Sequence, residues 1–327
     1  MIDLKAKPFY LSDDDIRWVE ETLAGMSLND KVGQLFSLIF MGADGAAYLN
    51  ELAEAGIKPC GLTGRPQDGP GAQQTVREMQ AAAEIPLLIS ANLERGGDGV
   101  AHGGTQFANP LQVAATDDET YAYRLGQICG REGRAVGVNW SFAPIIDIDY
   151  NYHNPITNTR TFGSDPERVL RMAKEYMRGI KESNLAVSIK HWPGDGVDGR
   201  DQHLLASVNS LSVEEWDATY GKIYAGMIDA GARTVMSAHI MLPAYSRKLR
   251  PGIKDEEILP ASLAEELNVD LLRGKLGFNG LIVSDATPMA GFNASLPHAI
   301  AVPQMIAAGC DVFLFSINIH QDFQFML

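Results

Sequence analysis

The chain has 327 residues, of which 46% are hydrophobic, so it is long and apolar enough to bury a substantial core. The formal net charge of -14 at pH 7, without any block of lysine and arginine, argues against a nucleic-acid partner. No apolar stretch is as long as a membrane span, and the N-terminus lacks the apolar region of a signal peptide, which predicts a cytoplasmic protein with no membrane partner. The three cysteines are widely spaced, so we expect them to be reduced thiols.

Short apolar runs alternate along the chain with longer segments of helical period. This alternation is typical of βα units around a parallel sheet. The predicted strands are VGQLFSLIF near Val32, PCGLTG near Pro59, PLLISAN from Pro86, VNWSFAPIID from Val138, LAVSIKHW from Leu185, RTVMSAHIM from Arg233, GLIVSDA from Gly280 and CDVFLFSI from Cys310. Apolar stripes over residues 169–180 and 216–227 predict helices that pack outside the sheet.

The eight repeats predict an α/β fold of the (β/α)8 TIM-barrel type. An open doubly wound sheet is disfavoured because no GxGxxG follows the first predicted strand. Only QDFQFML follows His320, so the eighth helix is expected to be truncated or missing, which leaves the last strand short of cover. No low-complexity linker divides the chain, and residues 1–327 are therefore expected to form a single catalytic domain.

Polar side chains follow several of the predicted strands. In barrels of this type the loops at the C-terminal ends of the strands build the active site. The residues at these ends are Asn92, Glu94, Asp147, Asp149, Lys190, His191, His239 and Asp285. Carboxylates, a lysine and imidazoles around one rim can bind a polyhydroxylated ligand and perform acid and base chemistry on it.

The segment KHWPGDGVDGRDQH, from Lys190 to His203, concentrates titratable groups on a glycine-rich stretch after a strand, which predicts a catalytic loop. A solvated loop whose aspartates serve turns is the alternative. A metal site on its aspartates and His203 is a further alternative, but the spacing fits neither a calcium loop nor a zinc helix. No metal or cofactor is therefore expected.

Four motifs give this sequence a family resemblance. KHWPGDGVDGRDQH resembles the KHFPGHGDT..DSH signature of the β-N-acetylglucosaminidase branch of glycoside hydrolase family 3. FAPIIDID, NTRTFGSDP from Asn158 and PASLAEELNVDLLRGKLGFNGLIVSDA resemble three further segments of the family in the same order. The resemblance covers most of the chain and implies a retaining, exo-acting β-glycosidase with a small carbohydrate substrate.

The resemblance also implies roles for three residues. Asp285, in IVSDA, would be the nucleophile that forms a covalent glycosyl enzyme. His203 would be the acid/base, assisted by Asp201, and an imidazole suits this role because it titrates near neutrality. The non-catalytic alternatives are that Asp285 caps a helix and that His203 is an ordinary surface histidine.

Further residues would bind the sugar. By the same resemblance, Arg160, Lys190 and His191 would hold sugar hydroxyls through charge-assisted hydrogen bonds, although Lys190 could instead form a structural ion pair. His239 would line the same pocket or be a buried core histidine with satisfied nitrogens.

Two positions depart from the family pattern. Asn92 stands where the family usually has an aspartate that grips sugar hydroxyls, and an amide donates as well as accepts hydrogen bonds. Asp195 replaces the second histidine of PGHG. The identity of the sugar therefore stays open, and a β-glucosidase or β-xylosidase of the same family and an inactive sugar-binding barrel remain alternatives. The sequence predicts neither the choice between water and phosphate as acceptor nor the oligomeric state.

Overall fold

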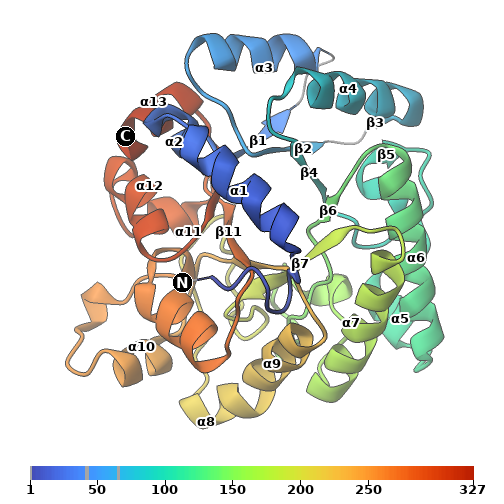
Figure 1. The fold of residues 1–327 in the computed structure, drawn as a ribbon. Helices are drawn as coiled ribbons and strands as arrows, with labels where there is room; N and C mark the ends of the chain where they lie inside the picture. Colours follow the sequence, from blue (N-terminus) through green and yellow to red (C-terminus); the bar gives the residue numbers. More distant parts are fainter. Residues whose placement is uncertain (1, 41–43, 65–66) are drawn as a thin grey trace.

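The computed structural model describes residues 2–40, 44–64 and 67–327. Eight parallel strands close into a barrel in the order β1-β12-β11-β9-β7-β6-β4-β2 (Figure 1). The strands are β1 (Phe36–Phe40), β2 (Gly61–Gly64), β4 (Leu88–Ala91), β6 (Trp140–Ser141), β7 (Ala186–Trp192), β9 (Thr234–Ser237), β11 (Leu281–Ala286) and β12 (Val312–Leu314). Each lies inside one of the predicted strand segments, so the predicted (β/α)8 barrel is confirmed.

Helices surround the barrel (Figure 1). They are α1 (Asp13–Gly25), α2 (Leu28–Gly33), α3 (Gly45–Glu54), α4 (Gly69–Ala82), α5 (Pro110–Ala114), α6 (Glu119–Ala135), α7 (Pro166–Lys181), α8 (Val213–Trp216), α9 (Lys222–Asp229), α10 (Pro243–Leu249), α11 (Ala290–Asn293), α12 (His298–Ala307) and α13 (Ile319–Met326). The π-helical segments Asp217–Gly221 and Glu266–Lys275 extend this layer. Two small parallel sheets, β3 (Gln67–Asp68) with β5 (Ala101–His102) and β8 (Ser207–Val208) with β10 (Ile240–Met241), are built by the connecting loops.

Helix α7 shows how the local sequence forms the outer layer. The Asp165 side chain caps it by accepting hydrogen bonds from two backbone N–H groups of the first turn, and Pro166 fits the first helical position. Its predicted apolar stripe is buried against the sheet. Gly126 and Gly179 let α6 and α7 approach closely, since a Cβ at Gly126 would lie 2.1 Å from the Tyr176 carbonyl oxygen.

The apolar core has two parts because successive strand side chains point to opposite faces of the sheet. One part lies between the strands and the helices. The other is built mainly from strand residues, namely Trp140, Phe142, Met236, Val283, Val312 and Leu314. Trp140 donates a hydrogen bond from Nε1 to Thr234 Oγ1 at 2.8 Å, which satisfies its buried polar atom.

The residues after β12 correct one expectation. They form the short helix α13, so the eighth helix is not missing. Its Phe323 is 2% exposed and lies 6.5 Å, between ring centroids, from Phe36 of β1. Helices α12 and α2 pack beside α13, so the last strand is covered (Figure 1).

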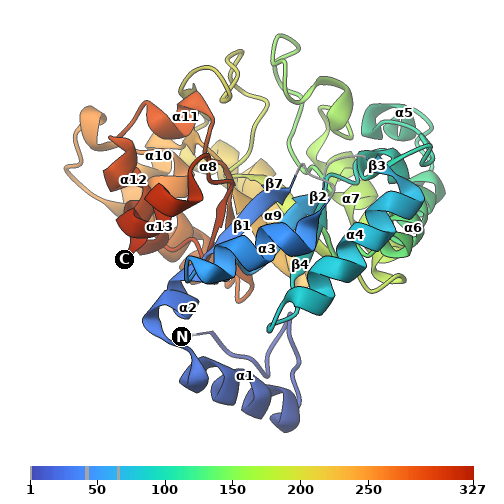
Figure 2. The same cartoon turned by 90° about the horizontal axis from the view of Figure 1, so that it is seen from above.

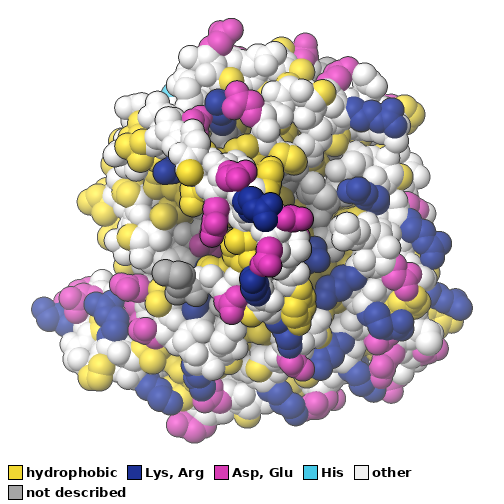
Figure 3. All heavy atoms as spheres, in the orientation of Figure 1, with side chains coloured by type: hydrophobic (Ala, Val, Ile, Leu, Met, Phe, Trp, Pro, Cys, Tyr) yellow, Lys and Arg dark blue, Asp and Glu magenta, His cyan; other side chains and the backbone are white. Residues whose placement is uncertain are grey.

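The N-terminal segment packs at the N-terminal ends of the strands. Asn279, just before β11, donates hydrogen bonds to the carbonyl oxygens of Asp3 and Lys7. Figure 2 shows α1 set apart from the barrel, and none of its residues is buried. Figure 3 shows acidic and basic side chains interspersed on one face. Within the described ranges, no helix combines the length and apolar character needed to cross a membrane.

Candidate active site

A cavity of about 190 Å³ opens at the C-terminal ends of the strands. Its lining residues are Asn92, Phe142, Arg160, Lys190, His191, His203, Met236, Asp285, Ala286, Met289, Leu314 and Phe315. Six of the eight residues predicted for the site, all except Asp201 and His239, are therefore among those that line this one cavity.

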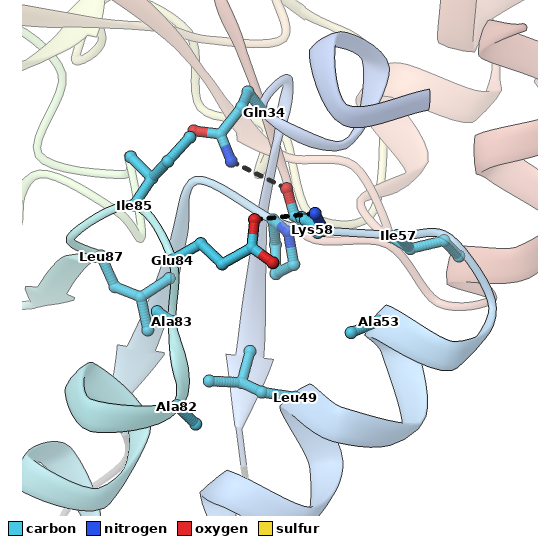
Figure 4. A pocket seen from close by; sticks show the side chains of 11 residues that line it. Gln34, Leu49, Ala53, Ile57, Lys58, Ala82, Ala83, Glu84, Ile85 and Leu87 are labelled. Atoms are coloured by element: carbon cyan, nitrogen blue, oxygen red, sulfur yellow. Dashed lines mark hydrogen bonds and ion pairs between the residues drawn. The ribbon is translucent and has the colours of Figure 1, made fainter. Parts of the chain in front are cut away.

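A pocket of about 60 Å³ lies at the opposite end of the barrel, where β1, β2 and β4 begin (Figure 4). Leucine, isoleucine and alanine side chains make up most of its lining, and Lys58 forms an ion pair there with Glu84 at 2.8 Å. No nucleophile is paired with a base in this pocket. The cavity at the C-terminal end is therefore the candidate active site.

Asp285 lies near the end of β11 and is 6% exposed. Its Oδ1 accepts a hydrogen bond from the Ala286 N–H at 2.7 Å, while the buried Oδ2 has no partner in the described part of the chain. Burial alone would raise the pKa of Asp285, but His191, His239, the Ala286 N–H and Lys190 together hold this pKa below its ordinary value. The cavity thus contains an ionised carboxylate with one free oxygen, which is what a nucleophile requires.

Glu94 connects the cationic residues of the cavity. Its carboxylate accepts two hydrogen bonds from Arg160, at 2.9 and 2.8 Å, and one from Lys190 Nζ at 2.9 Å. Burial favours the protonated acid, yet the charges of Lys190 and Arg160 hold the pKa of Glu94 far below its usual range. Lys190 also donates to Asn92 Oδ1 at 2.9 Å, and burial lowers the pKa of Lys190. Glu94 therefore fixes both cations at the rim.

His191 is held from behind by Asp147. The ring Nδ1 lies 2.6 Å from Asp147 Oδ2, and Asp147 Oδ1 accepts the backbone N–H groups of His191 and Asp195 at 3.0 and 2.8 Å. With Nδ1 occupied, Nε2 is the nitrogen left for a ligand. The buried Asp195 accepts from Asn154 Nδ2 at 2.8 Å, and burial, with Asp147 nearby, raises the pKa of Asp195 to about 6.

Asp201 and His203 form a pair on the loop between β7 and β8. The His203 Nδ1 lies 2.6 Å from Asp201 Oδ1, and the same oxygen accepts the His203 backbone N–H at 2.8 Å. Asp201 therefore holds the ring through Nδ1 and leaves Nε2 as the nitrogen able to exchange a proton in the cavity. A carboxylate in this position stabilises the imidazolium.

His239 lies next to the cavity with both ring nitrogens already engaged. Nε2 donates to the Ala286 carbonyl oxygen at 3.0 Å, and Nδ1 lies 2.8 Å from Ser262 Oγ. Burial lowers the pKa of His239, which favours the neutral ring. These contacts match the satisfied core histidine rather than a group that lines the cavity and binds sugar.

The aspartates considered for a metal site bind protein groups separately. Asp195 bonds Asn154, Asp198 bonds Arg200 and Asp201 bonds His203. Over residues 2–40, 44–64 and 67–327, no three histidine, cysteine or acidic side chains are grouped as metal ligands.

Comparison with known proteins gives the family. Residues 27–325 match the family model described as the glycosyl hydrolase family 3 N terminal domain. The chain belongs to this family. A beta-N-acetylglucosaminidase/beta-glucosidase of Cellulomonas fimi is 53% identical over 326 residues, which are 100% of this chain and 57% of that protein.

Solved structures of family 3 relatives share the barrel. The beta-glucoside phosphorylase BglX bound to 2FGlc superposes with a TM-score of 0.95 at 48% identity, over 99% of this chain and 58% of that one. A beta-N-acetylhexosaminidase from Beutenbergia cavernae gives 0.78 at 26% identity, over 93% of this chain and 91% of that one. The chain therefore spans little more than half the length of its more similar relatives and nearly all of a more distant one.

Proposed function

We propose that the protein is a retaining, exo-acting β-glycosidase that releases terminal β-linked N-acetylglucosamine and also accepts glucose. One observation carries the proposal: the buried, ionised Asp285, with a free Oδ2, lines the same cavity as His203, which is paired with Asp201. The name of the Cellulomonas fimi relative supports both sugars. A sugar-binding protein without turnover needs neither a nucleophile nor a proton carrier.

The first half-reaction forms the covalent intermediate. Asp285 Oδ2 attacks the anomeric carbon while the bond from that carbon to the leaving oxygen breaks. His203 Nε2 donates a proton to this oxygen, so the aglycone departs as an alcohol. The imidazolium is stabilised by Asp201 until the proton is transferred.

The second half-reaction restores the enzyme. A water molecule gives a proton to His203 and attacks the anomeric carbon, and the bond to Asp285 breaks. Two inversions at one carbon leave the product with the β configuration of the substrate.

Sugar binding is assigned to the cationic wall of the cavity. Arg160 and Lys190, oriented by Glu94, and the free nitrogen of His191 would donate hydrogen bonds to hydroxyls of the terminal sugar. Asn92 accepts from Lys190 through Oδ1, which leaves its amide N–H groups to donate to the sugar.

A second acceptor is favoured by one specific finding, the name of the structural relative BglX, a beta-glucoside phosphorylase. Inorganic phosphate would then attack the glycosyl enzyme and release a glycosyl phosphate. The imidazole of His203 supports this variant, because a catalytic carboxylate in its place would repel an approaching phosphate.

A panel of p-nitrophenyl β-glycosides tests the proposal. The purified chain should release p-nitrophenol from the N-acetylglucosaminide and the glucoside, and NMR should show the β anomer first. Adding phosphate and identifying free sugar or glycosyl phosphate decides the acceptor. Faster turnover of the xyloside would favour the β-xylosidase alternative, and binding of sugar without turnover would favour the inactive barrel.

We also propose that the protein acts in the cytoplasm as a catalytic domain. Cys60, Cys129 and Cys310 are unpaired, which suits a reducing compartment. Fractionation of the source cells, with activity measured in each fraction, tests this location.

A further inference from the structure

Gln202 lies between Asp201 and His203, the two residues of the proposed acid/base dyad. Its side chain is buried, whereas theirs are partly exposed. It is 1% exposed, whereas the side chains of Asp201 and His203 are 23% and 47% exposed. Leu204, the residue after His203, is 71% exposed. Gln202 is therefore a buried anchor in an otherwise solvated stretch of loop.

The contacts of this anchor lead to two neighbouring strand ends. Gln202 Oε1 accepts the backbone N–H of His239, after β9, at 2.9 Å. The carbonyl oxygens of Gln202 and His203 accept the N–H groups of Gly291 and Ala290, in the segment after β11, at 3.0 Å each. The loop with the dyad is thus attached to the chain that follows Asp285.

The close approach of the Gln202 loop to α11 depends on a glycine. A Cβ at Gly291 would lie 2.8 Å from the Gln202 carbonyl oxygen and 2.9 Å from the His239 Cβ. Any larger residue would push the loop away from the strand ends, so the attachment is a close fit.

The side chains of Asp201 and His203, the proposed acid/base dyad, have no comparable attachment. Within the described ranges, the side-chain hydrogen bonds of Asp201 and His203 join these two residues only to each other. Their mutual contact keeps the ring oriented relative to the loop. The distance from His203 to Asp285 must therefore be set by the contacts of the neighbouring loop residues.

We propose that Gln202 is a positioning residue that fixes the acid/base dyad relative to the nucleophile. This inference rests on the proposed function. Loss of the Gln202 side chain leaves the contact between Asp201 and His203 intact and leaves Asp285 untouched, but it frees the loop to shift. Proton donation tolerates such a shift poorly, because catalytic groups must keep their geometry to within a fraction of an ångström.

The test compares two leaving groups. In Gln202→Ala, kcat/KM for a methyl or sugar β-glycoside should fall about tenfold or more. For the 2,4-dinitrophenyl glycoside, kcat/KM should fall less than about threefold, because dinitrophenolate leaves without being protonated. Gly291→Ala should give the same split, since it displaces the loop from the other side. Gln202→Ser, with the residue of the family signature, should resemble Gln202→Ala because its side chain is shorter than that of glutamine.

Gln80→Ala is the matched control. Gln80 Oε1 accepts the Leu87 N–H at 2.9 Å at the far end of the barrel, just as Gln202 accepts that of His239. This variant should lose stability without altering the ratio of the two kcat/KM values. An equal loss on both substrates in Gln202→Ala and Gly291→Ala would overturn the proposal, and so would no change on either substrate.

Amide hydrogen exchange separates this proposal from the proposed function. The N–H groups of His239, Ala290 and Gly291 should exchange faster in Gln202→Ala than in the wild type, whatever the enzyme turns over. Unchanged protection at these three amides would refute the anchor. A wild type that cleaves no β-glycoside but shows the altered exchange would refute only the proposed function.

Discussion

Lys190 Nζ lies 2.9 Å from Glu94 Oε1, and this ion pair joins β7 to the segment after β4 at the cavity rim. Glu94→Gln should destabilise the fold by about 3 kcal/mol, because it leaves a buried ammonium without its counter-charge. It should also raise KM roughly tenfold, since Lys190 and Arg160 lose their orientation. Urea unfolding and steady-state kinetics measure the two effects.

Glu84→Gln is the control for this prediction. Glu84 pairs with Lys58 at 2.8 Å, but its side chain is 75% exposed, so the change should be under about 1 kcal/mol. Equal effects of the two substitutions would mean that the Glu94 pair contributes no more than a surface pair.

Asp285→Asn should lower kcat by on the order of 10⁴-fold while the protein stays folded, because an amide cannot attack the anomeric carbon. A 2-fluoro glycosyl fluoride should label the wild type at Asp285, as read by mass spectrometry of peptides. Asp322→Asn, at a buried aspartate bonded to His298 and Ser316, is the control and should keep activity. A label on another residue contradicts the assignment.

His203→Ala should reduce turnover of an alkyl β-glycoside by about 10³-fold and that of a dinitrophenyl glycoside by less than about tenfold. Proton donation matters most when the leaving group is poor. Asp201→Asn should show the same pattern more weakly, since the imidazole remains and only the neighbouring charge is lost. If both variants retain wild-type rates on both substrates, another residue supplies the proton.

The buried Asp195 predicts a pH dependence of stability. Because its pKa is raised to about 6, the folded protein keeps this carboxyl protonated between about pH 4 and 6 while the unfolded chain ionises it. The native state then binds more protons, so this group makes the free energy of unfolding fall as pH rises through the window. Asp195→Asn keeps an oxygen for Asn154 and should gain up to roughly 3 kcal/mol relative to wild type between pH 4 and 7.

Asp198 is the control, because its contribution to stability should depend on pH in the opposite direction. Burial would raise the pKa of Asp198, but hydrogen bonds from Arg200 and from the Val208 and Arg200 N–H groups hold it below its ordinary value. Its contribution to stability is present above the pKa of an unfolded aspartate and is lost as pH falls. The disadvantage of Asp198→Asn should therefore shrink toward acid pH. Parallel pH profiles for the two variants would contradict both assignments.

Phe323→Ala in α13 should cost about 3–5 kcal/mol in the free energy of unfolding, the usual loss for a buried phenylalanine. The half-buried Phe325 of the same helix is the matched control and should lose much less. A small loss for Phe323→Ala, measured by denaturant unfolding, would mean that α13 does not stabilise the closure of the barrel.

The barrel was predictable because its strands are apolar runs bounded by polar or glycine-rich residues, a signal that lies within a few residues of chain. The rim residues were predictable for the same reason, since Lys190, His191 and Asp285 end such runs. Helix α13 was underestimated because its stability comes from Phe36, which lies far away in the sequence. Length alone gave no indication of that contact.

The hydrogen bonds and ion pairs between the rim residues could not be predicted from the sequence. Glu94 was placed at the rim, but its pairing with Arg160 and Lys190 joins residues 66 and 96 positions apart. His239 could not be separated from a ligand-binding histidine, because its partner Ser262 is 23 residues away. Gln202 carried no signal, since glutamine on a loop is ordinarily solvated.

The residues proposed to bind the sugar and those proposed to transfer the proton lie on different kinds of structural element. Lys190 and His191 belong to β7, a strand paired on both sides, whereas Asp201 and His203 belong to the loop beyond it. Loops accept substitutions and insertions that a central strand does not. Over evolutionary time, relatives of this barrel can therefore keep the same sugar and change the aglycone or acceptor, and we expect sequence divergence to accumulate at the exposed loop residues 199, 200, 204 and 205 before it reaches β7.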